Sequence, residues 1–331
     1  MADWAPSPAS WSFSAQKRFE TCPRSYFYRR FWGHLPGDLK WRCFEMRSLE
    51  TMAAFRGKAV HSVIAGCLRS ASRGEPVDRD QARRRLAGAL REGFGQSARG
   101  WWSNKQRPSE LKIGQVTSLR EHYYGWERDE VERAAGEAQR HARSCVDSLL
   151  DSDLWRAVSA APESRWALIE GERPASFYLD GVLVYMKVDF AYWDSAPTIV
   201  DWKTGKPGDG DRSQLALYAL YAQDQWGWDP LQVRLMPVYL HPTLQSDSFQ
   251  AKADQLENVR QRVRRSFEEM QRLEPAPGCA ADEALFPRTE DLKVCRWCTF
   301  QGACDRVSVP SPRASDASAP QGMAASQPPG R

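Results

Sequence analysis

The sequence predicts an α/β (α+β) protein, in which a short mixed β-sheet is flanked by helices and preceded by a helical part. A change in the spacing of apolar residues along the chain supports this prediction. Apolar residues recur at helical spacing through the first 160 residues, and from about Trp166 the apolar period becomes two. A chain of 331 residues with 42% hydrophobic content and 14 Trp can also fill a substantial core.

The first 160 residues are expected to be helical. Ser12 or Ser14 is a plausible N-cap for the first helix, and further helices are predicted around 53–73, 78–97 and 115–150. The last of these rests on apolar residues spaced 3, 4 and 3, as one face of an amphipathic helix requires. These residues are Val116, Leu119, Tyr123 and Trp126.

The second half alternates strands and helices. The period of two from Val182 to Phe190 predicts one strand, and a turn then leads to a second strand, 198–203, antiparallel to the first. A helix over 214–226, a strand over 233–240 and a closing amphipathic helix from Leu256 to Met270 follow.

The composition excludes several classes of protein. The net charge is only +4, so an anionic partner needs a local basic surface. No window approaches the ~18 apolar residues of a membrane span, the N-terminus lacks the features of a signal peptide, and no P-loop is present. We therefore expect a cytoplasmic protein without its own ATP motor, in which clustered cysteines are first suspected as metal ligands.

The segment IVDWKTGK places an acid and an amine at the end of an apolar strand. Asp201 and Lys203 share one face of that strand, while Trp202 points away. Antiparallel pairing is expected to bring Asp189 beside Asp201, and converging carboxylates are typical of Mg²⁺ or Mn²⁺ sites. Taken alone, Asp201 with Lys203 also fits a surface ion pair.

The longer run KVDFAYWDSAPTIVDWKTGK resembles the active-site core of the PD-(D/E)XK nuclease superfamily, in its RecB-like branch. The resemblance implies a restriction-endonuclease-like core, with Asp189 and Asp201 as metal-binding acids and Lys203 as the catalytic lysine. Met186 stands where the family often has glycine, which removes no ligand.

Three further matches extend the resemblance. Gln214 and Tyr218 match the family's Q-x-x-x-Y, which implies catalytic-site residues that reach the active site or the DNA backbone from one helix face. His61 matches the histidine of G-x-x-x-H, which implies an additional metal ligand. Glu172 matches the further acid of this branch, and Glu170 is a competitor for that role.

Cys295, Cys298 and Cys304 form a C-x2-C-x5-C motif, and a closed metal site needs a fourth ligand. Cys279 is a local candidate, a distant cysteine is another, and the chemistry alone favours zinc. The motif resembles that of RecB-like nucleases with an iron-sulfur cluster, such as the AddB nuclease domain and CRISPR-associated RecB-like exonucleases. That resemblance implies Cys22, in CPRSYFYRR, as the fourth ligand of a 4Fe-4S cluster, with zinc as the alternative occupant.

The composition of the C-terminal tail, which has almost no large apolar residue, and the resemblance together imply a domain organisation. We expect a flexible N-terminus, 1–11, then a nuclease domain, 12–308, and a disordered tail, 309–331. Within the domain we expect a helical part at about 12–160, a catalytic core at about 161–273 and a cysteine-rich segment at about 274–308.

The implied function is metal-dependent hydrolysis of DNA phosphodiester bonds. We expect an exonuclease that acts on single-stranded or end-bearing DNA in repair, recombination or phage and defence processes, with Mg²⁺ or Mn²⁺. Two alternatives remain: a catalytically decayed iron-sulfur DNA-binding protein, and the nuclease subunit of a complex with a separate helicase.

Overall fold

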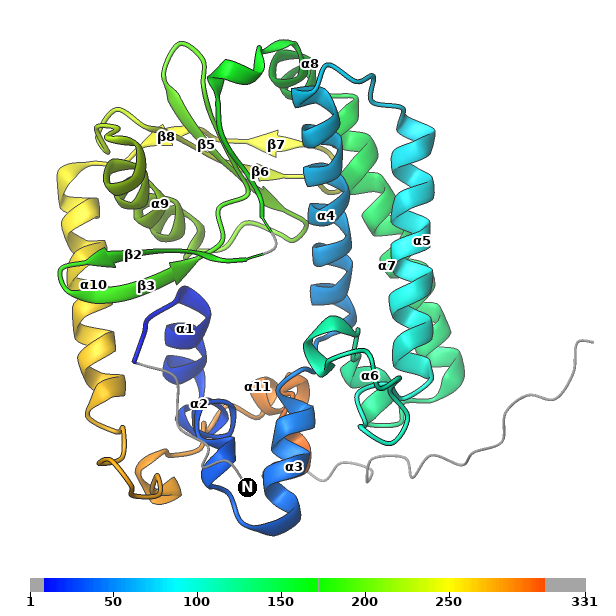
Figure 1. Ribbon diagram of the computed structural model, residues 1–331, viewed down its shortest axis with the longest axis vertical. Helices are drawn as coiled ribbons and strands as arrows, with labels where there is room; N and C mark the ends of the chain where they lie inside the picture. Colours follow the sequence, from blue (N-terminus) through cyan, green and yellow to red (C-terminus); the bar gives the residue numbers. More distant parts are fainter. Residues whose placement is uncertain (1–8, 172, 307–331) are drawn as a thin grey trace, which may run out of the picture.

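A computed structural model describes residues 9–171 and 173–306 of the chain (Figure 1). Over these ranges the α-helices are α1 (Phe13–Thr21), α2 (Pro23–Arg30), α3 (Gly37–Met46), α4 (Met52–Ser72), α5 (Arg79–Ala98), α6 (Arg120–Tyr123), α7 (Arg128–Leu150), α8 (Asp153–Ala160), α9 (Asp211–Trp226), α10 (Ala253–Gln271) and α11 (Leu292–Trp297). The strands are β1 (Trp166–Ile169), β2 (Ala175–Leu179), β3 (Val182–Met186), β4 (Phe190–Trp193), β5 (Pro197–Lys203), β6 (Arg234–Tyr239), β7 (Gln245–Ser246) and β8 (Phe249–Gln250).

The main sheet is mixed, as predicted. Its strand order is β1-β4-β5-β6-β7, with β8 also paired to β6. The β4–β5 pair is antiparallel, which confirms the prediction for 198–203, whereas β5 and β6 are parallel and are joined through α9. The described part of the chain is therefore a mixed α/β structure with the expected restriction-endonuclease-like character.

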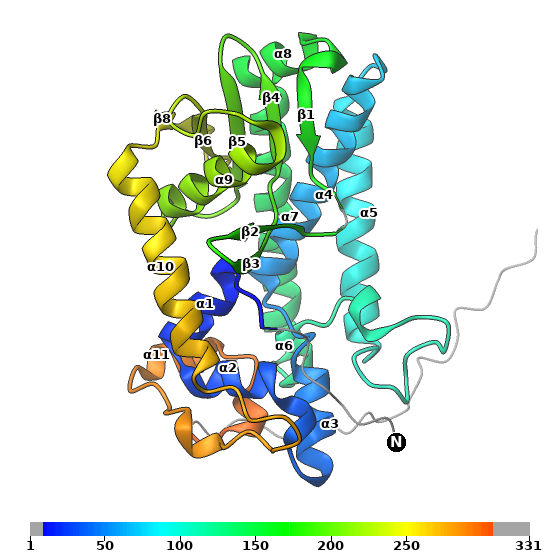
Figure 2. The ribbon, with the colours of Figure 1, turned by 60° about the vertical axis from the view of Figure 1, so that its left-hand side comes forward.

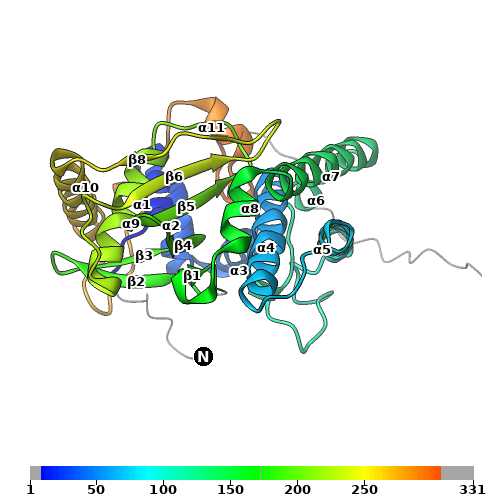
Figure 3. The ribbon, with the colours of Figure 1, turned by 90° about the horizontal axis from the view of Figure 1, so that it is seen from above.

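Helices cover both faces of this sheet, with α9 and α10 on one side and α4 and α8 on the other (Figure 3). Because side chains alternate along a strand, neighbouring residues of β5 enter different cores. Ile199 packs in the core that contains the apolar residues of α9, and Val200 and Trp202 pack in the core that contains those of α4. The end of β5 is thus fixed from both sides.

The predicted helix over 115–150 is wrong in its first third. The chain forms the short helix α6 and begins the long helix α7 only at Arg128. Glu50 explains the difference, since its backbone N–H donates to Ser118 O at 2.9 Å and its carbonyl accepts from Arg120 N at 2.9 Å. This pairing holds the segment extended, and Gly125, at φ +64°, then breaks the chain direction again.

The predicted single strand over 182–190 is also wrong, because it is two strands in two sheets. β3 pairs with β2 in a separate two-stranded sheet, and β4 pairs with β1 and β5. Between them the carbonyl of Lys187 accepts from the Tyr218 hydroxyl at 2.7 Å, and that of Asp189 accepts from Glu170 N at 2.7 Å. The alternation of apolar residues continues through this break, which is why sequence alone did not reveal it.

The two ends of the described chain meet at the end of the molecule away from the main sheet, where α11 lies beside α1 and α2 (Figures 1 and 2). Phe27 of α2 contacts Phe286 with ring centroids 5.1 Å apart. Trp11, expected within a flexible N-terminus, is instead 1% exposed, and it pairs through its backbone with Leu183 and Tyr185 of β3. The tail over 309–331 lies outside the described residues.

Candidate active site and cysteine pocket

The end of β5 carries the predicted acid and lysine on one face. Asp201 is 3% exposed, and its Oδ2 lies 2.6 Å from Lys203 Nζ. The ammonium also lies 3.3 Å from Asp211 Oδ1 and donates to Gln214 Oε1 at 3.0 Å. Lys203 is therefore held by three acceptors, two of them carboxylates, in a half-buried position.

Asp189 lies immediately before β4, where the pairing of Phe190 with Val200 brings it to the end of β5. Its Oδ2 accepts from the backbone N–H of Trp202 at 2.7 Å. Its Oδ1 lies 3.1 Å from His61 Nδ1 of α4. The expected convergence of Asp189 with β5 is thus present, and Asp189 links β5 to the helical part.

Glu170, just after β1, completes a cluster with these two residues. One ligand atom each from His61, Glu170 and Asp189 lie within 4.8 Å of one another. Glu170 Oε1 pairs with Lys187 Nζ at 2.5 Å, and Oε2 lies 3.4 Å from His61 Nδ1. The acid predicted from the sequence, Glu172, lies outside the described residues, whereas its competitor Glu170 occupies the cluster.

The charges of this region match a divalent cation. Four carboxylates, those of Glu170, Asp189, Asp201 and Asp211, lie around two ammonium groups, those of Lys187 and Lys203. Buried Glu170 Oε2 accepts no hydrogen bond from the described residues. Carboxylate oxygens and an imidazole nitrogen suit Mg²⁺ or Mn²⁺, so the donor set fits such an ion.

The pKa shifts follow from the same crowding. Burial and the neighbouring Asp189 raise the pKa of Asp201 to about 7. Burial lowers the pKa of His61, but the Asp189 and Glu170 carboxylates outweigh it and raise that pKa to about 10. Burial likewise lowers the pKa of Lys203, while Asp201 and Asp211 raise it above its usual value. Lys203 is consequently a protonated hydrogen-bond donor here.

The Q-x-x-x-Y pair lies on α9, with its side chains joined to each other. Gln214 Nε2 donates to the Tyr218 hydroxyl at 2.6 Å, and that hydroxyl donates to Lys187 O. Tyr218 is 2% exposed. Its role in this geometry is to fix the chain before Asp189, while Gln214 positions Lys203.

Asp211 and Lys187 are residues of the site that the sequence prediction missed. Asp211 Oδ2 accepts from the Tyr239 hydroxyl and from Gly208 N, both at 2.8 Å, which aims its other oxygen at Lys203. Two features of the sequence could have indicated them. Asp211 lies three residues before Gln214, on the same face of one helix, and Lys187 lies two residues before Asp189.

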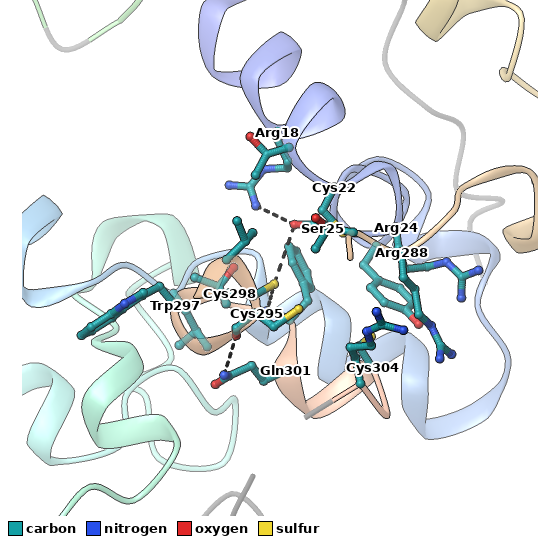
Figure 4. Close-up of a pocket in the computed structure, with 18 of the residues that line it drawn as sticks. Arg18, Cys22, Arg24, Ser25, Arg288, Cys295, Trp297, Cys298, Gln301 and Cys304 are labelled. Atoms are coloured by element: carbon teal, nitrogen blue, oxygen red, sulfur yellow. Dashed lines mark hydrogen bonds between the residues drawn. The ribbon is translucent and has the colours of Figure 1, made fainter. Parts of the chain in front are cut away.

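The four predicted cysteine ligands line one pocket of about 540 Å³ (Figure 4). Cys22 lies between α1 and α2, Cys295 lies in α11, and Cys298 and Cys304 follow α11. Burial, then Cys22 and Cys304, raise the pKa of the Cys295 thiol, which reflects their proximity. Cys279 is exposed and does not line this pocket.

The loop that carries these cysteines is fixed by α6. The buried Arg120 donates to the carbonyl of Arg296 and, at 2.9 Å, to Gln301 Oε1. The Tyr124 hydroxyl donates to Thr299 O at 2.8 Å, and Gln301 Nε2 donates to Cys295 O at 2.6 Å. The pocket is thus preformed by contacts of the described residues.

The family model of the PD-(D/E)XK nuclease superfamily matches residues 10–305, a range that includes every residue of the cluster and all four cysteines. The chain belongs to this superfamily. It is a nuclease by family, with DNA as the implied substrate, and the family generally uses divalent metal ions.

Two solved structures are similar to this nuclease. One is a candidate exonuclease from Eubacterium rectale, 11% identical, with 80% of this chain and 79% of that chain covered and a TM-score of 0.38. The other is SSO0001, 16% identical, with 53% of this chain and 80% of that chain covered and a TM-score of 0.28. No curated protein matches the chain.

Among the described residues, none of the helices has the length and the apolar character that a membrane span requires.

Proposed function

We propose that this protein is a Mg²⁺- or Mn²⁺-dependent exonuclease that hydrolyses phosphodiester bonds in single-stranded or end-bearing DNA. The observation that carries the proposal is the convergence of His61, Glu170 and Asp189 beside the Asp201–Lys203 pair. The preference for DNA ends rests on the resemblance to the RecB-like branch.

The residues divide into two roles. His61, Glu170, Asp189 and Asp201 would hold the divalent ion, which when bound activates water and offsets the charge that develops on the phosphate. Lys203, kept protonated by two carboxylates, donates hydrogen bonds that orient the attacking water and the phosphate oxygens. Without a cation, the four carboxylates of the site repel a phosphate, so substrate binding and metal binding support each other.

The test is cleavage of end-labelled single-stranded DNA in Mn²⁺ or Mg²⁺, with a circular single strand of the same composition beside it. Wild-type protein should shorten the linear strand and spare the circle. Asp201→Ala and Lys203→Ala should lower the rate by at least 10²-fold. Variants that cut at the wild-type rate would refute the active-site assignment. Cleavage of the circular strand before the linear strand would show that the enzyme is an endonuclease.

We also propose that Cys22, Cys295, Cys298 and Cys304 bind a 4Fe-4S cluster with a structural role, with zinc as the competing occupant. Four thiols satisfy either metal. The Arg18 guanidinium lies near Cys22 and Cys298, where it would offset the thiolate charge of either occupant. The preference for the cluster rests on the resemblance to iron-sulfur RecB-like nucleases, because Zn²⁺ and an oxidised 4Fe-4S cluster carry the same net charge when each is bound by four thiolates.

Anaerobically purified protein should be brown and contain iron and sulfide. Cys22→Ser should lose the metal, whereas Cys279→Ser, a matched change at an exposed thiol outside the pocket, should retain it. Stoichiometric zinc without iron would replace the cluster, and full metal content in Cys22→Ser would exclude that cysteine as a ligand.

A further inference from the structure

A second pocket of about 540 Å³ lies beside the start of α1 and shares Arg18 and Ser14 with the cysteine pocket. We call it the arginine pocket, after the four arginines that line it: Arg18, Arg29, Arg30 and Arg47. Serine hydroxyls and aromatic rings make up most of the remaining lining, and no described aspartate or glutamate lines it. Its local charge is therefore strongly positive in a chain with a net charge of only +4.

Three of these guanidinium groups form no ion pair with a carboxylate of the described residues. Arg18 donates to Ser25 Oγ at 3.0 Å, and Arg29 donates to the backbone carbonyl of Arg47 at 2.7 Å. Arg47 stacks over Trp32, 5.3 Å from the ring centroid, and its buried Nε has no acceptor. Only Arg30 is neutralised, by Glu274 at 2.8 Å.

The surface of α10 provides a contrast within the same molecule. Arg260 and Arg264 both pair with Asp180, and Arg262 pairs with Glu20. Carboxylate partners are thus the ordinary arrangement for arginines on this neighbouring helix. Arg18 also faces the thiols of the cysteine pocket, but Arg29 and Arg47 have no anionic partner among the described residues. Convergence of these guanidinium groups is unfavourable unless an anion joins them. Arg29 is exposed, but partial desolvation of its guanidinium and the charges of Arg18 and Arg47 lower the pKa of Arg29 to about 10, which is consistent with this crowding.

The pocket is connected to the active site through β3. Tyr185 lines the pocket, and its backbone N–H donates to Trp11 O at 2.8 Å, which fixes the start of α1 against the strand. Two residues further, Lys187 pairs with Glu170 of the candidate metal cluster. Two residues of extended chain span at most about 7 Å, so one nucleic-acid strand can contact both sites.

We propose that the arginine pocket binds a phosphate group of the nucleic-acid strand that enters the active site, and so sets how the strand is positioned for cleavage. Guanidinium groups match phosphate in both charge and bidentate geometry. The exposed Tyr185 offers a ring face for a neighbouring base. This inference rests on the proposed nuclease function and adds a site to it. The phosphate can come from the interior of the strand or from its 5′ end.

Binding is tested apart from cleavage, with the full-length protein in EDTA and a fluorescent 15-nucleotide single strand followed by anisotropy. Arg29→Gln, at an exposed position, and Arg47→Gln are compared with Arg264→Gln, a matched change on α10. Each pocket variant should bind about tenfold more weakly, with the slope of log K against log [salt] reduced by about one. The α10 variant should bind like the wild type.

Two arms identify the source of the phosphate. An equal loss with 5′-phosphorylated and 5′-hydroxyl strands indicates an interior phosphate, and a loss confined to the phosphorylated strand indicates the terminus. Both support the proposal. The proposal would be overturned if both pocket variants bound the strand with wild-type affinity and salt slope. It would also be overturned if poly-glutamate, at the same concentration of charge, displaced the labelled strand as well as unlabelled DNA does.

Failure of this inference is distinguishable from failure of the nuclease function. If the protein binds DNA through the pocket but never cleaves it, the phosphate site is supported and the nuclease function is refuted. A protein that cleaves DNA, and whose Arg29→Gln and Arg47→Gln variants bind like wild type, has no phosphate site there.

Discussion

Glu170→Gln tests which acid belongs to the metal cluster. The change keeps the size of the side chain and an oxygen that can accept from Lys187 Nζ, but it removes the negative charge that lies 3.4 Å from His61. Glu172→Gln, two residues away, is the matched control because the sequence predicts that residue for the same role. Comparison of the two variants therefore distinguishes the loss of one metal-ligand charge from the loss of any negative charge in this segment.

The expected magnitude follows from the contacts. Even residues that only orient metal ligands are worth 10–100-fold in metal affinity, so loss of the Glu170 carboxylate should raise the Mn²⁺ dissociation constant by at least tenfold, about 1.4 kcal/mol. The fold itself should change little. Burial raises the pKa of Glu170, but His61 and Lys187 outweigh it and lower that pKa below its usual value. The ionised carboxylate thus stabilises the fold modestly, and its loss should lower Tm by a few degrees at most.

The assay is calorimetric titration of Mn²⁺ into the metal-free protein, followed by cleavage rates across the same Mn²⁺ range. Glu170→Gln should need more Mn²⁺ for half-maximal activity, and Glu172→Gln should behave like wild type. The reverse pattern, or identical titrations for both variants, would refute the assignment of Glu170 to the cluster.

Three further predictions concern residues that hold the site in place. Asp211→Asn removes one of the two carboxylates at Lys203, so we expect cleavage to slow about tenfold with unchanged Mn²⁺ affinity in the same calorimetric titration. Tyr218→Phe removes the hydrogen bond to Lys187 O, which should cost about 1 kcal/mol of unfolding free energy in urea titration; an unchanged midpoint would contradict it. Arg120→Met leaves the carbonyls of the cysteine loop without their buried donor. We expect it to lose about 2–4 kcal/mol of stability and to make the C-terminal segment sensitive to protease, whereas equal resistance would contradict the anchoring role.

Much of the fold was predictable because local periodicity reports burial directly. The helices at 53–73 and 78–97 and the antiparallel strand at 198–203 agree with α4, α5 and β5 within about two residues. The two wrong secondary-structure predictions share one cause. At 115–127 and at 187–189 the chain is held by partners distant in sequence, Glu50 in the first case and Tyr218 in the second. No local pattern encodes such partners.

The site divides in the same way. Asp189, Asp201 and Lys203 were predictable since a strand fixes which side chains share a face, and the structure brings Gln214, Tyr218 and His61 to them. Asp211 was missed because its role depends on how α9 docks against β5. Glu170 and Glu172 have the same parity on an extended segment, so alternation could not distinguish them.

One short segment connects the cysteine pocket to the candidate active site. Trp11 fixes the start of α1 to β3, and its Nε1 donates to Ser266 Oγ of α10 at 2.9 Å. β3 leads directly to Lys187 and Asp189, which contact Glu170 and His61. A group that joins Cys22 to the C-terminal cysteines would therefore hold α1, and through it β3, in the position that the metal cluster requires. Loss of that group should weaken Mn²⁺ binding even though none of its ligands touches the cluster. If nuclease activity and Mn²⁺ affinity survive in a folded Cys22→Ser protein that has lost its metal, this mechanical connection is wrong.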